Sequence, residues 1–430
     1  MTKTEGSAET IPPKWTRKKL KYLASLRSGD AITAESISEA GEYPVYGGNG
    51  LRGFTSGFTH SGSFVLIGRQ GALCGCINYA SGRFWASEHA VVVDTGGRFN
   101  VRWLGEILRS LDLNQYSQSA AQPGLAVDTI ANLSVPVPPE AEQNAIGAFV
   151  ERQSAKINAL VEKKERLITL LEEKRAALIN RAVTKGLDPS APMKTSGILW
   201  LGSVPAHWQV KRLKNISVGG LTNGIFKTKD AYGDGTPLIN VVDVYQSDHR
   251  ICFDNLDRVR AIPTEAEKYR VSAGDILFVR SSLKLEGTGA SALVDHVPEP
   301  TVFECHLVRL RPDPCLAVPG FLSLYLNSAL VRQRTVAIAQ TTTMSTIGQN
   351  ELACLPVVLP PPPEQGRICA AIDADSQRID AAILKIREQI AKFHEYRTAL
   401  ISAAVTGKID VRECGAASAE FDKRSQVDEH

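Results

Sequence analysis

The sequence predicts an α+β fold built as a tandem repeat, in which two mixed α/β globular regions are each followed by a long helix. There are two proline-rich segments, VPVPPEAEQ at 135–143 and LPPPPEQ at 359–365. Each one ends the secondary-structure element before it and is followed by a long helical pattern. Short entry and tail motifs also occur once in each half of the chain. A chain of 430 residues is too long for one ordinary core, so we expect at least two domains.

The repeat is visible at both ends of each half. The entry motif PPKWTRKKLKYLA begins at Pro12, and its counterpart PAHWQVKRLKNIS begins at Pro205. The tail motif ALINRAVTKGLD begins at Ala177, and ALISAAVTGKID begins at Ala399. Two large modules, rather than a short-period solenoid, therefore share one frame.

The two helical segments carry apolar residues at seven-residue intervals. In the second helix these are Ile372, Ile379, Ile386, Phe393 and Leu400. In the first they are Val150, Ile157, Leu171 and Leu178, interrupted by Lys164, and we expect Leu160, Leu167 and Ile168 to widen that stripe. This spacing predicts a coiled-coil seam. A helix over about 140–183 would be roughly 65 Å long and needs a partner along its length. That partner is either the other copy or each helix's own globular region.

Between the helices lie globular regions at about 25–137 and 218–358. Their β-like runs are SFVLIG, HAVVVD, LINVVDV, GDILFVRSS and HLVRLRPD, and each region also has one helical stretch, VRWLGEILRSLD or GFLSLYLNSALVRQRTV. The mixture predicts α/β or α+β modules. The two middles differ in sequence, which indicates a common frame with two different surfaces.

Local charge favours a polyanionic partner although the net charge is only +3. No Asp or Glu occurs from Tyr43 to Ser87, and a second acid-free stretch, Ile11 to Gly29, contains six Lys and Arg residues. Arg can read guanine and Gln can read adenine in the major groove. For each candidate residue, an ordinary solvated loop remains the alternative. The candidate DNA-binding residues are Asn49, Arg52, Arg69, Gln70 and Arg83 in the first region, Lys227, Arg280, Ser281, Ser282 and Lys284 in the second, and further the polar segment 340–343.

Catalytic motifs are missing. There is no phosphate-binding loop, no Asn/Asp-Pro-Pro-Tyr/Phe segment of amino-methylating enzymes, and no His/Cys cluster with metal-ligand spacing. The eight cysteines lack a C-x-x-C pair, which predicts reduced, mostly buried thiols, and no apolar run is long enough to span a membrane. We therefore expect no catalytic residue and no metal site in this chain.

These features together resemble the specificity subunit of type I restriction-modification systems over about residues 11–412. The resemblance is carried by the Glu-Gln pairs that follow the prolines at 142–143 and 364–365, by the tail motifs, and by GSVPAHW at 202–208. YPVYGGNGLRGF and GDILFVRSS are similar to segments of that family's target-recognition domains.

The resemblance implies a non-catalytic subunit with pseudo-two-fold symmetry. Each globular domain would read one half of a bipartite DNA site, and the two helices would form an antiparallel coiled coil that sets the spacing. The implied boundaries are 1–137 for target-recognition domain 1, 138–188 for the central helical spacer, 189–358 for target-recognition domain 2, 359–412 for the C-terminal helical spacer, and 413–430 for a disordered tail.

The implied partners are double-stranded DNA and two methylase subunits, which bring S-adenosylmethionine and methylate adenine N6. A nuclease subunit that uses ATP and Mg²⁺ could join them. The chain itself would bind no cofactor and would be cytoplasmic, with no membrane contact. Two alternatives stay open at this point: a coiled-coil adaptor that binds no DNA, and a self-contained methylase or nuclease.

Overall fold

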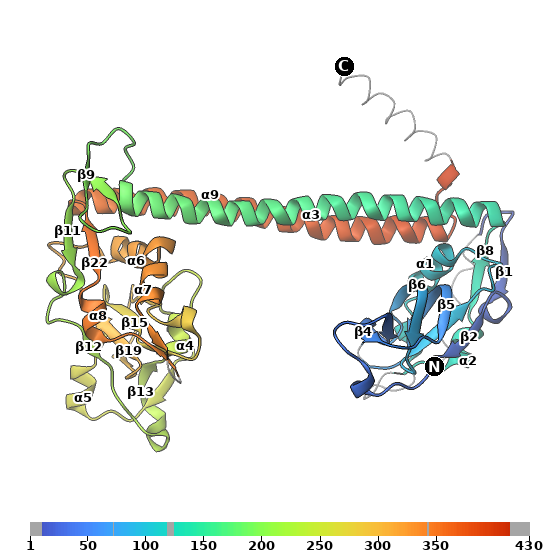
Figure 1. The fold of residues 1–430 in the computed structure, drawn as a ribbon, viewed down its shortest axis with the longest axis horizontal. Helices are drawn as coiled ribbons and strands as arrows, with labels where there is room; N and C mark the ends of the chain where they lie inside the picture. Colours follow the sequence, from blue (N-terminus) through green and yellow to red (C-terminus); the bar gives the residue numbers. More distant parts are fainter. Residues whose placement is uncertain (1–10, 72, 118–123, 342–343, 413–430) are drawn as a thin grey trace. The chain divides into compact units, whose positions relative to one another are not determined.

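The computed structural model describes residues 11–71, 73–117, 124–341 and 344–412, which form two compact units (Figure 1). Unit 1 combines Met1–Glu165 with Arg387–His430, and unit 2 is Arg166–Ile386. Each unit contains one globular region together with part of both long helices. The mixed α/β tandem fold with two long helices is thus confirmed. The segment 413–430, expected to be disordered, lies outside the described residues.

Unit 1 is organised around a six-stranded sheet in the order β2-β7-β5-β6-β3-β4, with helix α1 packed on β5 and β6. A separate pair, β1 and β8, lies beside it. The buried face of α1 contributes Trp103, Leu104, Ile107 and Leu108 to the core. The elements are β1 (Thr16–Lys19), β2 (Ser25–Ser28), β3 (Tyr43–Gly47), β4 (Gly50–Thr55), β5 (His60–Gly68), β6 (Ile77–Ala86), β7 (Ala90–Asp94), α1 (Val101–Ser110), α2 (Val127–Ala131) and β8 (Ser134–Val137).

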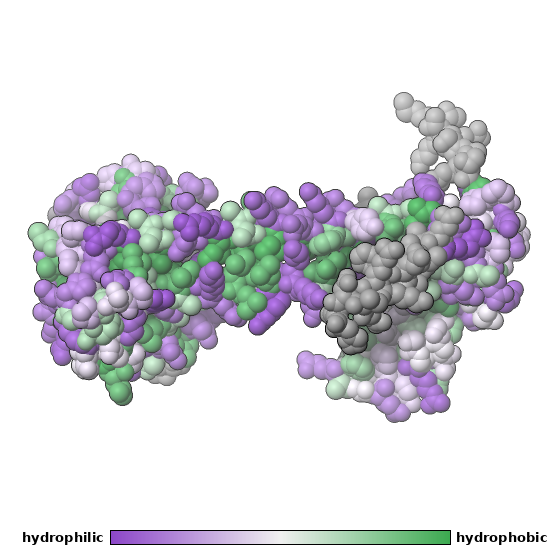
Figure 2. Space-filling model, turned by 90° about the horizontal axis from the view of Figure 1, so that it is seen from above, coloured by the Kyte–Doolittle hydropathy of each residue, from purple (hydrophilic) through white to green (hydrophobic). Residues whose placement is uncertain are grey.

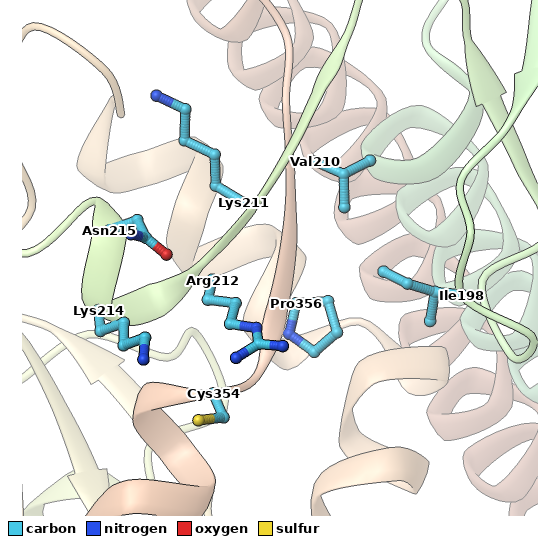
Figure 3. A pocket seen from close by; sticks show the side chains of 8 residues that line it. All are labelled: Ile198, Val210, Lys211, Arg212, Lys214, Asn215, Cys354 and Pro356. Carbon is cyan, nitrogen blue, oxygen red and sulfur yellow. The ribbon is translucent and has the colours of Figure 1, made fainter.

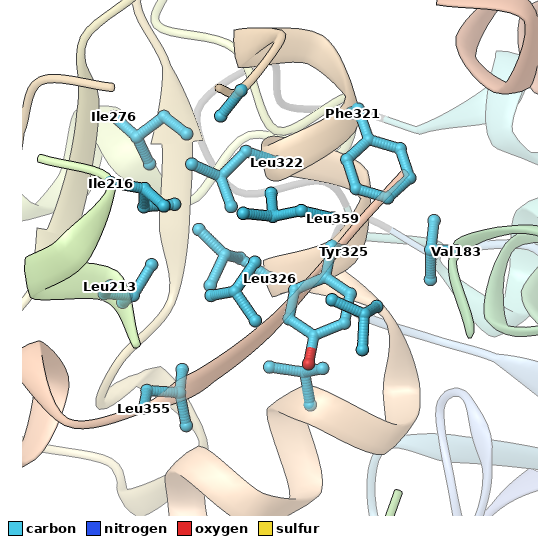
Figure 4. Packing of buried hydrophobic residues seen from close by; sticks show 14 of the residues in the cluster. Val183, Leu213, Ile216, Ile276, Phe321, Leu322, Tyr325, Leu326, Leu355 and Leu359 are labelled. Atoms are coloured by element: carbon cyan, nitrogen blue, oxygen red, sulfur yellow. The ribbon is translucent and has the colours of Figure 1, made fainter. Parts of the chain in front are cut away.

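Unit 2 has several smaller sheets, of which the four-stranded one runs in the order β12-β19-β15-β17. Its core gathers Phe321, Leu322 and Tyr325 against Ile276 and Val183 (Figure 4). The elements are β9 (Met193–Thr195), β10 (Ser203–Pro205), β11 (Gln209–Arg212), β12 (Thr222–Asn223), β13 (Tyr232–Ile239), α4 (Val241–Val244), β14 (Asp257–Val259), α5 (Pro263–Lys268), β15 (Ile276–Val279), β16 (Ser281–Ser282), β17 (Ser291–Leu293), β18 (Val302–Phe303), β19 (Leu307–Leu310), α6 (Pro319–Asn327), α7 (Ala329–Ala337), β20 (Gln340–Thr341), β21 (Ser345–Thr346), α8 (Gln349–Ala353) and β22 (Pro356–Leu359).

The run LINVVDV differs from the expectation of one strand. Strand β13 ends at Ile239, and helix α4 follows at once. Asn240 caps this helix, and Asp243 Oδ2 accepts a hydrogen bond from Asn240 N at 2.7 Å. This capping box stabilises the first turn and overrides the β propensity of the valines.

The long helices α3 (Glu140–Lys185) and α9 (Pro362–Val405) begin in the same way. Gln143 and Gln365 are buried, and each Nε2 donates to the carbonyl of the proline five residues earlier. Each Oε1 accepts from a backbone N–H at the start of another helix, that of Asn100 at 3.2 Å or of Val318 at 2.7 Å. The glutamine after each proline segment therefore ties a long helix to its globular region.

Within each unit the two helices pair in opposite directions. In unit 1 the early residues Ile146 and Val150 of α3 share a core with the late residues Leu400 and Ala404 of α9. In unit 2 the late residue Leu178 of α3 packs with the early residue Ile372 of α9. The coiled coil is thus antiparallel, and each helix contacts both a globular region and the other helix.

The expected seam positions differ in burial. Val150, Ile157, Ile372, Ile379 and Ile386 are buried, whereas Leu171, Leu178, Phe393 and Leu400 are half-buried. Leu160 and Leu167 do not join the seam, because 43% and 41% of their surface is exposed. The second stripe of α3 instead runs through Ser154, Val161, Ile168, Arg175 and Ala182. Two of these positions are polar, which hid the stripe in the sequence.

A polar contact crosses the helix pair in each unit. In unit 1 Arg397 Nη1 donates to Asn158 Oδ1 at 2.9 Å. In unit 2 Arg175 forms an ion pair with Asp380. The two arginines occupy matching places in the duplicated helices, as do Asn158 and Asp380. The partner of the arginine is therefore a neutral amide in unit 1 and a carboxylate in unit 2.

No helix in the described ranges is both long and apolar enough to cross a lipid bilayer. The seven described cysteines are all free, but only Cys74 is fully buried. Cys252 and Cys315 are exposed, so the expectation of mostly buried thiols is wrong.

Candidate nucleic-acid interface

Three loops of unit 1 meet where strands β3 and β5 end and β7 begins. The turn at Gly48 and Asn49 lies so close to the loop after β5 that a Cβ at Gly48 would be 3.0 Å from His89 O and 3.5 Å from Gln70 O. A Cβ at Gly68 would collide with the carbonyl oxygen of Gly48. A side chain at residue 68 would therefore clash with this turn, and one at residue 48 would be crowded. The close approach of the two backbones brings Asn49 next to Arg69 and Gln70.

Arg69 is held in place by its backbone and its side chain. Its N–H donates to His89 O, its carbonyl accepts from Leu125 N, both at 2.9 Å, and Nη1 donates to Ser28 Oγ at 3.0 Å. The guanidinium is half-buried, whereas Gln70 is exposed and its Oε1 lies 3.0 Å from His89 Nδ1. Sequence reasoning missed Ser28 and His89, since nothing in their local patterns shows that β2 and β7 flank this loop.

The other two candidates of unit 1 lie differently. Arg52 is exposed on β4, and its side chain folds over Gly47 beside the same turn. Arg83 is exposed on β6, with its guanidinium 5.0 Å from the ring of Phe58. The Phe58 ring in turn packs at a tilt of 56° against Tyr43, at the opposite end of β3. The structure thus brings Asn49, Arg52, Arg69 and Gln70 together but leaves Arg83 apart.

Unit 2 places Arg280 on the backbone position that corresponds to Arg69. Both follow the strand at the centre of a sheet, β15 or β5. The N–H of Arg280 donates to His306 O at 2.7 Å, and its carbonyl accepts from Ile347 N at 2.9 Å. His306 and His89 therefore match as well, and Arg280 is half-buried as Arg69 is.

Three further candidates of unit 2, Ser281, Ser282 and Lys284, line a pocket of ≈ 560 Å³ that is also lined by Tyr245 and His306. Ser281 and Ser282 are nearly buried in its wall, and Ser282 Oγ accepts from Tyr245 Oη at 3.1 Å. Lys284 is exposed at its rim. The two serines are therefore recessed in the pocket wall rather than exposed on a loop.

Lys227 and Gln340 do not line that pocket. Lys227 Nζ donates to Glu265 Oε2 at 2.7 Å, and this hydrogen bond lowers the pKa of the Glu265 carboxyl. Gln340 lines a small cavity of ≈ 170 Å³ together with Arg280. Residues 342 and 343 lie outside the described part of the chain.

Three consecutive side chains, Glu304, Cys305 and His306, hold their ligand atoms within 4.8 Å of one another. Glu304 Oε1 already accepts from Val241 N at 2.8 Å. Burial raises the pKa of the Cys305 thiol, and the neighbouring Glu304 raises it further, which disfavours the thiolate that a metal requires. We assign Glu304 a structural role in joining β18 to α4.

Comparison with known proteins follows the duplicated architecture. A family model described as the type I restriction modification DNA specificity domain matches residues 12–170 and again 205–392. The two matches together cover most of the chain and coincide with its two repeats.

Curated relatives match over parts of the chain. The EcoprrI type I restriction enzyme specificity subunit of Escherichia coli is 42% identical over 140 residues, which are 32% of this chain and 35% of that protein. The putative MjaX specificity subunit of Methanocaldococcus jannaschii is 30% identical over 194 residues, 45% of this chain and 44% of that protein. The chain spans less than half the length of these relatives.

Solved structures share the fold over nearly the whole chain. One, from a study of complex assembly and conformational transition of the type I R-M system, matches with a TM-score of 0.61 and 17% identity over 93% of this chain and 100% of that one. The HsdS subunit from Thermoanaerobacter tengcongensis matches with a TM-score of 0.53 and 17% identity over 94% and 99%. At this identity the likeness concerns the fold alone.

Proposed function

Because the chain belongs to the family that carries the type I restriction modification DNA specificity domain, we propose that it is the DNA-recognition subunit of such a system. Each unit reads one half of a bipartite site. The observation that carries this proposal is the matched placement of Arg69 and Arg280, each anchored through its backbone to a histidine carbonyl at the same point of a duplicated frame.

The geometry around Arg69 suits direct reading of bases. Arginine pairs bidentately with guanine and glutamine with adenine, so Arg69 and Gln70 offer two adjacent reading groups. The hydrogen bond to Ser28 restricts the Arg69 side chain before DNA arrives. In unit 2 the matching arginine is followed by Ser281, which is short and recessed. Different side chains on one frame give two different half-sites.

The long helices serve as the spacer and as the docking site for two methylase subunits. Because the two helices pair with each other in both units, each is held at a fixed length. Several large apolar side chains on the helices remain exposed. Figure 2 shows apolar surface, in green, along the helices among hydrophilic surface in purple. The exposed residues are Leu160 and Tyr396 in unit 1 and Leu167, Leu170 and Leu384 in unit 2.

Catalysis is supplied by the partners in this proposal. The methylase subunits bring S-adenosylmethionine, and a nuclease subunit, where present, brings ATP and Mg²⁺ chemistry. The complex acts in the cytoplasm. We also retain the division into recognition domains 1–137 and 189–358, spacers 138–188 and 359–412, and a tail 413–430.

Mapping methylated adenines in cells that carry this chain and its methylase tests the proposal. We expect two modified adenines, one in each half of an interrupted sequence. Arg69→Ala should relax one half-site and Arg280→Ala the other, each by about 1–3 kcal/mol of discrimination, or roughly 5- to 150-fold. Loss of both half-sites in either variant, or one uninterrupted target, would contradict the proposal.

The spacer role has its own test. Residues 157–163 of α3 and 392–398 of α9 face each other, and their joint removal shortens the pair by one heptad, about 10 Å. The gap between half-sites should then change by about three base pairs, at ~3.4 Å each. Removal of only one of the two segments should mainly disturb assembly. An active complex with an unchanged gap argues against a ruler.

A further inference from the structure

Each unit carries a short basic segment that the recognition loops do not use. The first consists of the end of β1 and the single helical turn Leu20–Tyr22 that comes after it. The second consists of the end of β11 and the turn Leu213–Asn215. Leu20 and Leu213 are completely buried, so they fix how each segment is presented. We call these segments the basic strips, and their cations are Lys18, Lys19 and Lys21 in unit 1 and Lys211, Arg212 and Lys214 in unit 2.

The strips share one scaffold. β1 pairs with β8 and β11 pairs with β22, both antiparallel and in the same register. The N–H of Leu20 donates to Leu133 O and that of Leu213 to Leu355 O, each at 3.0 Å. Three cations are thus repeated at matching positions of two units whose middle segments differ. That repetition points to a task common to both units, rather than to reading one half-site.

No carboxylate of the described residues pairs with these strips. The strands paired with them, SVPV and PVVL, contain no acid. Within the described ranges, none of the six cations forms an ion pair, although Lys21 Nζ lies 5.5 Å from the ring centre of Tyr22. β1 is exposed along its whole length. The strips therefore present unneutralised positive charge to solvent.

In unit 2 the strip lines a groove of ≈ 730 Å³, and none of the described residues that line it is acidic. Figure 3 shows Arg212 and Lys214 extending toward Cys354, whereas Lys211 extends away from them. Asn215 adds an amide that can donate to an oxygen acceptor. The groove thus offers charged and neutral hydrogen-bond donors to an oxyanion.

The strips lie away from the reading loops of their own units. In unit 1 β2 runs from the strip toward Ser28 beside Arg69, and Lys21 and Ser28 are seven residues apart in sequence. A fully extended segment of this length spans at most about 23 Å at ~3.3 Å per residue. Figure 1 shows β1 and β4 at opposite sides of unit 1, and β11 and α4 at opposite sides of unit 2. This greatest possible separation corresponds to about seven base pairs of duplex at ~3.4 Å each.

We propose that the basic strips bind backbone phosphates of duplex DNA outside the bases that each unit reads. This inference rests on the proposed function. A row of cations without acids fits regularly spaced phosphates, whereas a protein interface usually has an apolar centre depleted of charge. Such contacts carry no sequence information and position the units on the duplex.

Salt-dependent binding to two duplexes tests the proposal, with the full chain purified together with its methylase. One duplex ends about two base pairs outside each half-site, and the other extends about one helical turn, ~10 base pairs, further on both sides. The test variants are Lys18→Gln/Lys19→Gln/Lys21→Gln and Lys211→Gln/Arg212→Gln/Lys214→Gln. On the long duplex each should lower the slope of log K against log salt by up to about 2.7, or ~0.9 per phosphate contact. On the short duplex neither should change it.

A matched control removes three exposed cations outside the strips, the long helices and the candidate recognition residues, by Arg98→Gln/Lys229→Gln/Lys268→Gln. It should leave both slopes unchanged. Equal slopes for the strip variants and the unaltered chain on the long duplex overturn the proposal. The proposal is also overturned if the strip variants bind DNA normally but no longer retain the methylase. That result would mean that the strips bind an acidic surface of a protein. Failure of the proposed function is separate: the unaltered chain would then not prefer its target over random DNA of either length.

Discussion

Units 1 and 2 share a backbone frame but fill it with different chemistry. In unit 1 Tyr79 Oη donates to Glu106 Oε1 at 2.9 Å, and Arg109 contacts both carboxylate oxygens at 2.9 Å. Burial and the Glu106 charge raise the pKa of Tyr79 well above its usual value. The matching positions in unit 2 are Leu293, Leu324 and Asn327. A cluster with charged side chains and one without them thus support the same sheet-helix contact, so the frame does not depend on a particular interior.

The largest expected effect comes from breaking the polar cluster of unit 1. Glu106→Leu leaves the buried Tyr79 hydroxyl and the Arg109 guanidinium without their carboxylate and should cost about 2–3 kcal/mol of unfolding free energy. The triple variant Tyr79→Leu/Glu106→Leu/Arg109→Asn copies unit 2 and should recover most of that loss. Denaturant unfolding combined with hydrogen exchange in unit 1 measures both. A single variant as stable as the unaltered chain would show that the cluster contributes nothing.

A smaller difference concerns the tryptophan at each entry motif. Trp208 Nε1 donates to Glu364 Oε1 at 3.1 Å, and Glu364 Oε2 lies 2.7 Å from His207 Nε2. In unit 1 the buried Trp15 Nε1 has no partner among the described residues.

Glu364→Ala should therefore destabilise unit 2 by about 1–2 kcal/mol, because the indole N–H loses its charged acceptor. The matched control Glu142→Ala in unit 1 should cost less than about 0.5 kcal/mol, as surface changes usually do. Thermal unfolding of the two variants gives the comparison. Equal losses would mean that Glu142 supports Trp15 in solution as Glu364 supports Trp208.

The smallest expected effect lies in the coiled coil. Asp380→Asn gives unit 2 the neutral contact of unit 1, and Asn158→Asp gives unit 1 an ionic one. Since 63% of the Asp380 side chain and 31% of the Arg175 side chain are exposed, the ion pair is screened. We expect changes of about 0.5 kcal/mol, a loss for the first variant and a gain for the second. Both should shrink between low and high salt in urea unfolding, and changes insensitive to salt would contradict an ionic origin.

Sequence reasoning reached the features that depend on local pattern. The prolines followed by Glu-Gln mark the starts of α3 and α9, and the heptads of α9 place Ile372, Ile379 and Ile386 in the buried seam. Tertiary contacts decided the rest. Arg175, a polar residue, occupies a position of the buried stripe of α3 because Asp380 of α9 faces it. This pairing joins distant parts of the chain, so no local pattern reveals it.

The candidate interface shows the same limit. Arg69 and Arg280 could be chosen from their place after a strand, but their equivalence is defined by bonds to His89 and His306, which no local pattern reveals. Lys227 looked like a free cation in the sequence, yet Glu265 of α5 pairs with it. Ser281 and Ser282 are recessed because β16 pairs with β21.

The course of α9 has a consequence for biosynthesis. The core of unit 1 includes Ala404, Val405 and Val411, which pack with residues of the first half of the chain, and a Cβ at Gly407 would lie 2.5 Å from Pro12 Cγ. Unit 2 is one continuous segment that is complete at Ile386. The module translated second can therefore finish folding on the ribosome first, while the earlier module waits for the last turns of α9 to emerge.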